Sequence, residues 1–264
     1  MKFSKQPIVA VAAAFCLVCC LGVAGADTSI YGPTGMVLNP TADLAPVGVT
    51  EGTIMWFNQD NTANGGGDVD WMTLSAVGGA RNDSEFNIGY NRLDVDVKQG
   101  PAGWKDEADG LIAGMKFRLS EESEKLPAIA GGVSYFSASG LYERTAVYLC
   151  ATRNLSLPQE GNLGLRGTAG LRWTDAEYSA VSKSDIIPFV GVEARLAPKL
   201  NLILELESEH KFPGARTNTP FSAMLRYRAT ENLLLHVGAL NTGFEDSSAV
   251  GVGISYIWER VGWR

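Results

Sequence analysis

The stretch Gly110-Leu-Ile-Ala-Gly-Met-Lys-Phe-Arg-Leu119 decides the fold of this chain, because apolar and polar side chains alternate along it. Successive side chains of a β-strand point to opposite faces, so one face here carries leucine, alanine, methionine and phenylalanine. The other face carries Lys116, Arg118 and two glycines. Leu163–Thr174 repeats the pattern, with Arg166 and Arg172 opposite its apolar face. Such cations suit the polar interior of a transmembrane barrel, whose apolar outer face meets lipid.

About twelve such segments lie between Glu51 and Trp258, each about as long as a tilted strand that crosses a bilayer. Their connections alternate between long and short, as in outer-membrane barrels with long external loops and short periplasmic turns. The sequence therefore predicts an all-β fold, an antiparallel transmembrane β-barrel of about twelve strands. Ten or fourteen strands are the alternatives, because Ser139–Tyr142 is short where a long loop is expected. The expected strands are 50–58, 69–80, 84–96, 108–119, 127–138, 143–154, 162–174, 186–197, 200–209, 220–229, 232–241 and 248–258.

Two further expectations concern loops and aromatic residues. Thr174–Asp185 is expected to be a long loop, and Ala197–Lys199 a tight turn. Aromatic residues near the strand ends suit the two membrane interfaces, where such side chains collect in transmembrane proteins. These residues are Trp56, Trp71, Tyr90, Trp173, Tyr227, Tyr256 and Trp258.

The chain divides into three parts by composition. Residues 1–26 resemble an export signal, with Lys2 and Lys5 before an apolar stretch and Ala24-Gly25-Ala26 as the cleavage site. A transmembrane anchor or a lipoprotein signal at Cys19 or Cys20 are the alternatives. Residues 27–49 are rich in proline and glycine and are expected to form a periplasmic segment that packs at the barrel mouth. Residues 50–264 are expected to form the outer-membrane barrel.

Charge and cysteine content exclude some classes of protein. The chain carries 22 basic and 29 acidic residues, and removal of the signal takes away two of the basic ones. An acidic chain of this kind is not expected to bind nucleic acid. Of the four cysteines, Cys150 alone lies outside the signal, so no internal disulfide is expected in the mature chain.

Catalytic motifs are scarce. The two histidines are His210 and His236. Ser208, His210 and Glu207 have the residue types of a Ser–His–acid triad, but neighbours on one strand alternate between its faces and cannot converge. Asp68 and Asp70 suit a solvated acidic loop better than a calcium site. We therefore expect no enzyme activity, no cofactor and no metal site.

The predicted inner face carries charges of both signs on neighbouring strands. Cross-strand neighbours of opposite sign attract each other, so we expect a lumen charge ladder. The ladder either braces the lumen as a structural element or lines a conduit that selects solutes by charge. Its members are Lys116, Arg118, Arg166, Arg172, Glu193, Arg195, Glu205, Glu207, Arg226 and Arg228.

The segment before the barrel supplies a family resemblance. Gly32-Pro33-Thr34-Gly35, then Asn39-Pro40-Thr41-Ala42, then a turn at Pro46 and Gly48, resembles the opening of YjbH-like outer-membrane proteins associated with exopolysaccharide. The strand–turn–strand unit Phe221–Leu240 is similar to repeats of that family. The resemblance covers about twenty residues, and the chain is much shorter than the large members of the family. It implies an outer-membrane β-barrel linked to surface polysaccharide and supplies no catalytic residues.

These observations together predict a non-enzymatic protein of the cell outer membrane. It is either a narrow channel or an accessory to exopolysaccharide export. A lipid-modifying barrel enzyme and a soluble periplasmic β-protein are the alternatives; the second would place its apolar face inward. Its expected partners are outer-membrane lipid, the barrel-assembly machinery, and polysaccharide or small solutes.

Overall fold

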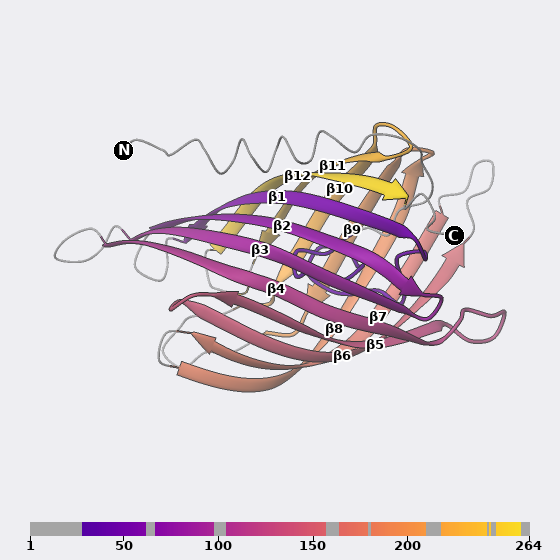
Figure 1. The fold of residues 1–264 in the computed structure, drawn as a ribbon, viewed down its shortest axis with the longest axis horizontal. Coiled ribbons are helices and arrows are strands. Elements are labelled where there is room, and N and C mark those ends of the chain that lie inside the picture. The colour runs from indigo at the N-terminus through magenta and orange to yellow at the C-terminus, as the bar shows by residue number, and fades with distance from the viewer. Residues whose placement is uncertain are drawn as a thin grey trace.

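The computed structural model is a closed barrel of twelve antiparallel strands in which each strand pairs with its neighbours in sequence (Figure 1). It describes residues 28–61, 67–97, 104–156, 164–178, 181–209, 218–241, 243 and 247–259. The expected signal peptide, 1–26, lies outside the described residues. The strands are β1 (Val49–Asn61), β2 (Gly67–Arg81), β3 (Ser84–Val97), β4 (Trp104–Ser120), β5 (Ala128–Ala138), β6 (Tyr142–Ser156), β7 (Gly164–Tyr178), β8 (Val181–Ala197), β9 (Leu200–Glu207), β10 (Phe221–Arg228), β11 (Leu233–Asn241) and β12 (Ser247–Glu259).

All twelve predicted strands are confirmed. The first and last strands close the barrel along their whole length, from Val49 opposite Glu259 to Asn61 opposite Ser247. The short connection after β5 is a tight turn in which Gly140 adopts a φ of 77°, so the count stays at twelve. A closed barrel leaves no unpaired strand edge, which is why the chain needs no disulfide to hold the sheet together.

The prediction of a long loop at Thr174–Asp185 is wrong. Strand β7 continues to Tyr178 and β8 begins at Val181, with Thr174 paired to Asp185. Polar side chains pair across these extensions, where the Ser184 hydroxyl donates to the Asp175 carboxylate at 2.5 Å. The prediction failed because it required apolar alternation, and a strand that extends beyond the lipid does not need it.

The outer and inner faces of the wall have opposite character. Large apolar side chains stand exposed on the outer face, while the intervening residues are buried in the lumen, as for Lys116 between Met115 and Phe117. A soluble β-protein would show the reverse arrangement, so the structure rules against that alternative. Within the described residues, no helix is long and apolar enough to cross a membrane. The exposed residues include Leu111, Met115, Phe117, Leu149, Leu171, Val190, Leu204, Leu225, Val237 and Val252.

The lumen is occupied by the chain that precedes β1. This lumen segment, Thr28–Gly48, lies inside the barrel, where its indigo trace is visible behind the front strands (Figure 1). We expected it at the mouth, but the structure extends it deep into the lumen, with Ile30, Val37 and Asn39 almost fully buried. The buried backbone N–H and C=O groups of this irregular segment need hydrogen-bond partners. The wall residues that supply those partners define the candidate site.

Candidate functional site in the barrel lumen

The lumen segment has almost no regular secondary structure and folds back on itself. Isolated bridges join Thr28 to Thr34 and Gly35 to Pro40. At Gly32 the φ is 100°, and a Cβ there would overlap Asn87 of the wall, so glycine suits both the backbone and the space. The chain leaves the lumen at the end where β1 begins and β12 ends, which we call the terminal end. A bridge from Val47 to Gly79 anchors it there.

Glu205 on β9 holds the middle of the lumen segment. Its two carboxylate oxygens accept the backbone N–H groups of Val37 at 3.0 Å, Leu38 at 2.9 Å and Asn39 at 3.0 Å. The Ser222 hydroxyl on β10 donates to the same carboxylate. Burial of a carboxylate costs free energy unless several hydrogen-bond donors compensate for the lost water. Here the wall and the lumen segment supply those donors together.

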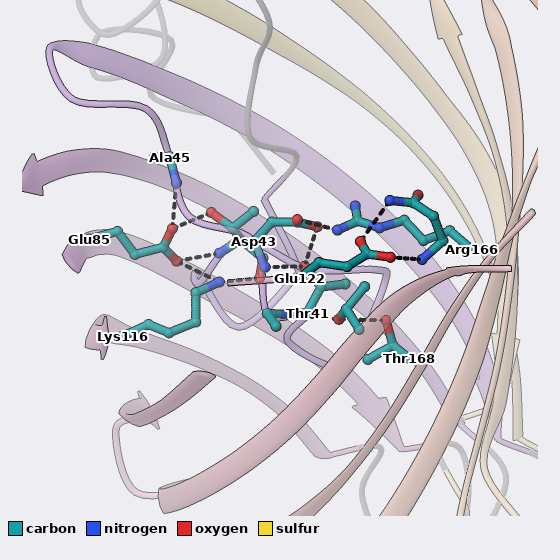
Figure 2. Close-up of polar contacts among 12 residues, drawn as sticks. Thr41, Asp43, Ala45, Glu85, Lys116, Glu122, Arg166 and Thr168 are labelled. Atoms are coloured by element: carbon teal, nitrogen blue, oxygen red, sulfur yellow. Dashed lines mark hydrogen bonds and ion pairs between the residues drawn. The ribbon is translucent and has the colours of Figure 1, made fainter. Parts of the chain in front are cut away.

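Glu85 on β3 and Lys116 on β4 form a second attachment point, with both side chains at 0% exposure and 3.0 Å apart (Figure 2). Glu85 accepts the Thr34 N–H and the Ala45 N–H, both at 2.8 Å, and the Thr34 hydroxyl at 2.5 Å. Lys116 donates to the Thr34 carbonyl at 2.7 Å. The pair therefore joins two parts of the lumen segment that are eleven positions apart in the chain.

Asp43 and Ala42 attach the segment to β6 and β7. Arg166 donates to the Asp43 carboxylate, and the Ala42 N–H donates to the Thr152 hydroxyl at 2.8 Å (Figure 2). Partial burial pushes the pKa of Asp43 upward, but the hydrogen bond and charge of Arg166, with the charge of Lys116, outweigh it. The pKa of Asp43 is therefore held below its ordinary value of 3.8.

Acid should weaken the Asp43 attachment, and the substitution Asp43→Asn isolates its contribution. Because the pKa in the folded protein is depressed, the stabilisation is present above the ordinary carboxyl value and is lost as the pH falls through the folded value. The Asp43 side chain is 35% exposed, so we expect at most about 1 kcal/mol. Urea unfolding followed by tryptophan fluorescence at pH 6 and pH 3 measures it. The difference between wild type and Asp43→Asn should be present at pH 6 and reduced at pH 3; equal differences at both values would contradict the assignment.

Arg172 and Glu51 of the wall also hold the lumen segment. Arg172 on β7 donates to the Asn39 side-chain oxygen at 2.7 Å and pairs with Glu207 on β9 at 3.0 Å. Glu51 on β1 is fully buried and accepts the N–H of Thr28 at 3.2 Å. The segment is thus tied to β1, β3, β4, β6, β7 and β9, which lie around the whole wall.

An apolar and aromatic cluster fills the lumen further from the terminal end. Tyr31 of the lumen segment contacts Phe136 edge-on at 5.4 Å and Trp71 at 6.0 Å between ring centroids. The Arg144 guanidinium lies 3.4 Å from the Tyr31 ring centroid, in cation–π geometry. Trp71 is therefore inside the barrel, and its predicted place at the outer interface is wrong. In this state the side chains of this cluster pack against one another inside the lumen.

The charged residues predicted on β8, β9 and β10 lie on the inner face, and Glu193 lies opposite Arg166 of β7 in the register, as one pair of opposite charges. The register places Gly191 and Ser222 opposite Glu205, and Arg226 opposite Asn201. Glu193 accepts from Asn201 at 2.7 Å, and Arg195 donates to the Pro198 carbonyl. The cross-strand partner of a side chain depends on the register of the two strands, and a shift of one residue changes every pair.

The remaining members of the predicted set have mixed roles. Lys116, Arg166, Arg172, Glu205 and Glu207 contact the lumen segment or each other, as described above. Arg118 pairs with Glu121 at 3.2 Å near the terminal end. Arg228 donates to the Glu231 carbonyl at 3.1 Å, and Arg226 approaches the His236 ring at 3.5 Å.

Several residues that hold the segment were missing from the predicted set: Asp43, Glu51, Glu85 and Arg144. The signal for Glu85 was present, because it precedes Phe86 in a stretch whose outward-facing apolar residues continue at Ile88 and Tyr90. Asp43 offered no such signal, since it lies in a segment without periodicity.

The described lumen contains a Ser–His contact, but its surroundings oppose catalysis. Ser255 lies 2.8 Å from Nε2 of His236, and the Arg226 guanidinium faces Nδ1 of the same ring. A general base needs an acceptor at Nδ1, such as a carboxylate, whereas a cation there disfavours proton uptake by the imidazole. His210 lies outside the described residues. Among the residues that the structure describes, no three His, Cys, Asp or Glu side chains gather to hold a metal ion.

A closed antiparallel wall with an apolar outer face and a polar-lined, filled lumen defines the fold of an outer-membrane β-barrel. The structure is similar to that of the KdgM porin, at 14% identity over 77% of this chain and 98% of the porin, with a TM-score of 0.52. The structure is also similar to that of the KdgM porin in complex with disordered oligogalacturonate. The identity is 14% over 78% of this chain and 98% of that chain, with a TM-score of 0.52. The COG4313 outer membrane channel from Pseudomonas putida F1 matches at 12% identity over 84% of this chain and 100% of the channel, with a TM-score of 0.60.

No protein-family model and no curated protein matches the sequence. At these identities the structural likeness shows the fold alone.

Proposed function

We propose that this protein is a narrow, non-enzymatic outer-membrane channel for small polar solutes, closed by its own lumen segment. The observation that carries the proposal is that the wall closes without the segment, while the wall attaches the segment through ionisable groups. A permanently filled core would be at least as stable with apolar contacts in place of buried charges. Glu85, Lys116 and Glu205 would instead line a hydrated passage once the segment withdrew.

Removal of the lumen segment tests the proposal most directly. Deletion of residues 29–44 keeps the expected cleavage site and the wall, and exposes the attachment residues to water. We expect steady conductance from the deletion variant in planar bilayers, and rare or brief openings from the wild type. A barrel that keeps its heat-modifiable gel mobility after the deletion and conducts no ions would contradict the channel.

A reversible crosslink supplies the matched control. The Met36 side chain reaches Gly191 of the wall, where a Cβ would meet its sulfur, and we therefore choose these two positions for cysteine substitutions that join segment and wall. In a Cys150→Ala background, the oxidised Met36→Cys/Gly191→Cys variant should stay closed, and reduction should restore the wild-type openings. Equal openings in both redox states would show that current bypasses the segment.

The link to exopolysaccharide and the YjbH-like family remains part of the proposal. Its support is that the quoted motif residues have defined roles: Gly32 fits against Asn87, and Asn39 accepts from Arg172. The export signal over 1–26, the assembly machinery and polysaccharide as partner belong to the same proposal. Loss of surface polysaccharide in a strain that lacks this protein, restored by the intact chain, would support the link.

A further inference from the structure

A cavity of about 210 Å³ opens at the terminal end of the inner wall, away from the attachment points of the lumen segment. Arg195 of β8, Lys199 of the following turn, and Arg226 and Arg228 of β10 line it, together with Asn201 of β9. We call these five residues the arginine pocket. Four cations therefore converge from two strands and a turn, and no acidic side chain is among the residues that line the cavity.

Two of these cations, Arg195 and Arg228, differ from Lys116, Arg166 and Arg172 in how their charge is balanced. Lys116, Arg166 and Arg172 each form an ion pair with a carboxylate. Within the described parts of the chain, Arg195 and Arg228 form no ion pair; their bonds go to backbone carbonyls. The groups next to the arginine pocket do not make its net charge negative.

Three neighbouring groups face the arginine pocket from the elements around it. Glu193 of β8 is the adjacent acid, and Asn201 donates to it at 2.7 Å. Glu231 turns its backbone carbonyl, rather than a lining carboxylate, toward Arg228. His236 of β11 lies against Arg226. The local charge therefore remains positive.

The backbone bonds also orient the two outer arginines. Arg195 donates to the Pro198 carbonyl at 3.0 Å and Arg228 to the Glu231 carbonyl at 3.1 Å. A guanidinium has five N–H donors, so one bond of this kind fixes the group and leaves donors for a ligand. Arginine forks match the geometry of carboxylate and phosphate oxygens.

We propose that the arginine pocket binds a small oxyanion, a phosphate or carboxylate group of a soluble solute. A volume of about 210 Å³ suits a small anion and is below the size of most organic-ligand pockets. A lipid headgroup is a poor occupant because the strand residues of the pocket lie on the inner face, while Leu204 and Leu225 of the same strands face outward. The site deepens the proposed channel by placing an anion-binding step at one end of its passage.

Calorimetric titration of the full chain in detergent with sodium phosphate, at constant ionic strength set by chloride, tests the site. A parallel titration uses citrate as a carboxylate probe. We expect saturable binding of one anion per barrel, weakened at least about tenfold in Arg195→Gln/Arg228→Gln because two charge-assisted contacts are lost. The control Arg118→Gln/Lys125→Gln removes the same charge at the same end, outside the cavity, and should bind as the wild type does.

Absence of saturable binding by the wild type for both probes would overturn the site, as would equal affinity in the pocket variant that retains its heat-modifiable fold. Equal weakening in both double variants would also overturn it, since a general surface charge would then explain the binding. Calorimetry measures anion binding without any ionic current, so its result tests the arginine pocket independently of the proposed channel. A deletion variant that conducts but binds no anion refutes the pocket alone, and a barrel that binds but never conducts refutes the channel alone.

Discussion

The substitution Glu205→Gln should open the barrel. The change is nearly isosteric, but it places an amide NH₂ where one carboxylate oxygen accepts N–H groups of the lumen segment. Val37 and Leu38 donate to one oxygen and Asn39 to the other, so the amide can satisfy one side only. A buried donor without an acceptor costs about 1 to 3 kcal/mol, and the negative charge that strengthens the remaining bond is lost as well. We expect the closed state to lose about 3 to 5 kcal/mol relative to the open state.

The ratio of closed to open barrels should therefore fall by about 10² to about 4 × 10³. Open probability in planar bilayers at neutral pH measures it. Two control variants with smaller expected effects are compared with Glu205→Gln. Ser222→Ala removes one hydroxyl donor from the same carboxylate and should raise the open probability by about tenfold or less. Glu121→Gln removes an exposed charge that pairs with Arg118, away from the attachment points of the segment, and should change nothing. A Glu205→Gln barrel that is folded and as closed as the wild type would show that this carboxylate does not hold the segment in place.

The wall of the barrel was predictable because its physics is periodic. Lipid on one side and polar groups on the other force a two-residue alternation, as in the run that contains Lys116 and Arg118, and twelve strands follow from counting it. Tight turns such as the one between β8 and β9 carry their own signal in proline and charge. The extension of β7 and β8 was missed because strands outside the lipid lose that alternation.

The contents of the lumen were not predictable by the same means. The lumen segment has no period, and its partners are distant in the chain: Thr34 contacts Glu85 at a separation of 51 residues, and Val37 contacts Glu205 at 168. The sequence marked Glu205 as an inner charge but suggested an arginine as its partner. Folding instead gave it backbone N–H groups, which every residue carries and which leave no trace in the sequence.

Loss of the Glu85 carboxylate should destabilise the whole barrel more than loss of the Lys116 ammonium. Glu85→Ala leaves a buried ammonium without its counter-ion, and leaves the N–H groups of Thr34 and Ala45 without an acceptor. Removal of one partner of a buried pair typically costs about 3 to 5 kcal/mol. In Lys116→Met the carboxylate keeps its three donors from the lumen segment, so we expect a smaller loss, about 2 kcal/mol.

Urea unfolding of the barrel in lipid vesicles, followed by tryptophan fluorescence, gives these free energies. The double variant Glu85→Ala/Lys116→Met is the decisive comparison, because it removes the stranded ammonium and should recover part of the stability lost in Glu85→Ala. The matched surface control is Glu121→Ala, which breaks the exposed pair with Arg118 and should cost at most about 0.5 kcal/mol. If Glu85→Ala proves no more costly than this control, the buried pair does not fasten the segment to the wall. If the double variant is less stable than Glu85→Ala, the stranded charge is not what makes the single substitution costly.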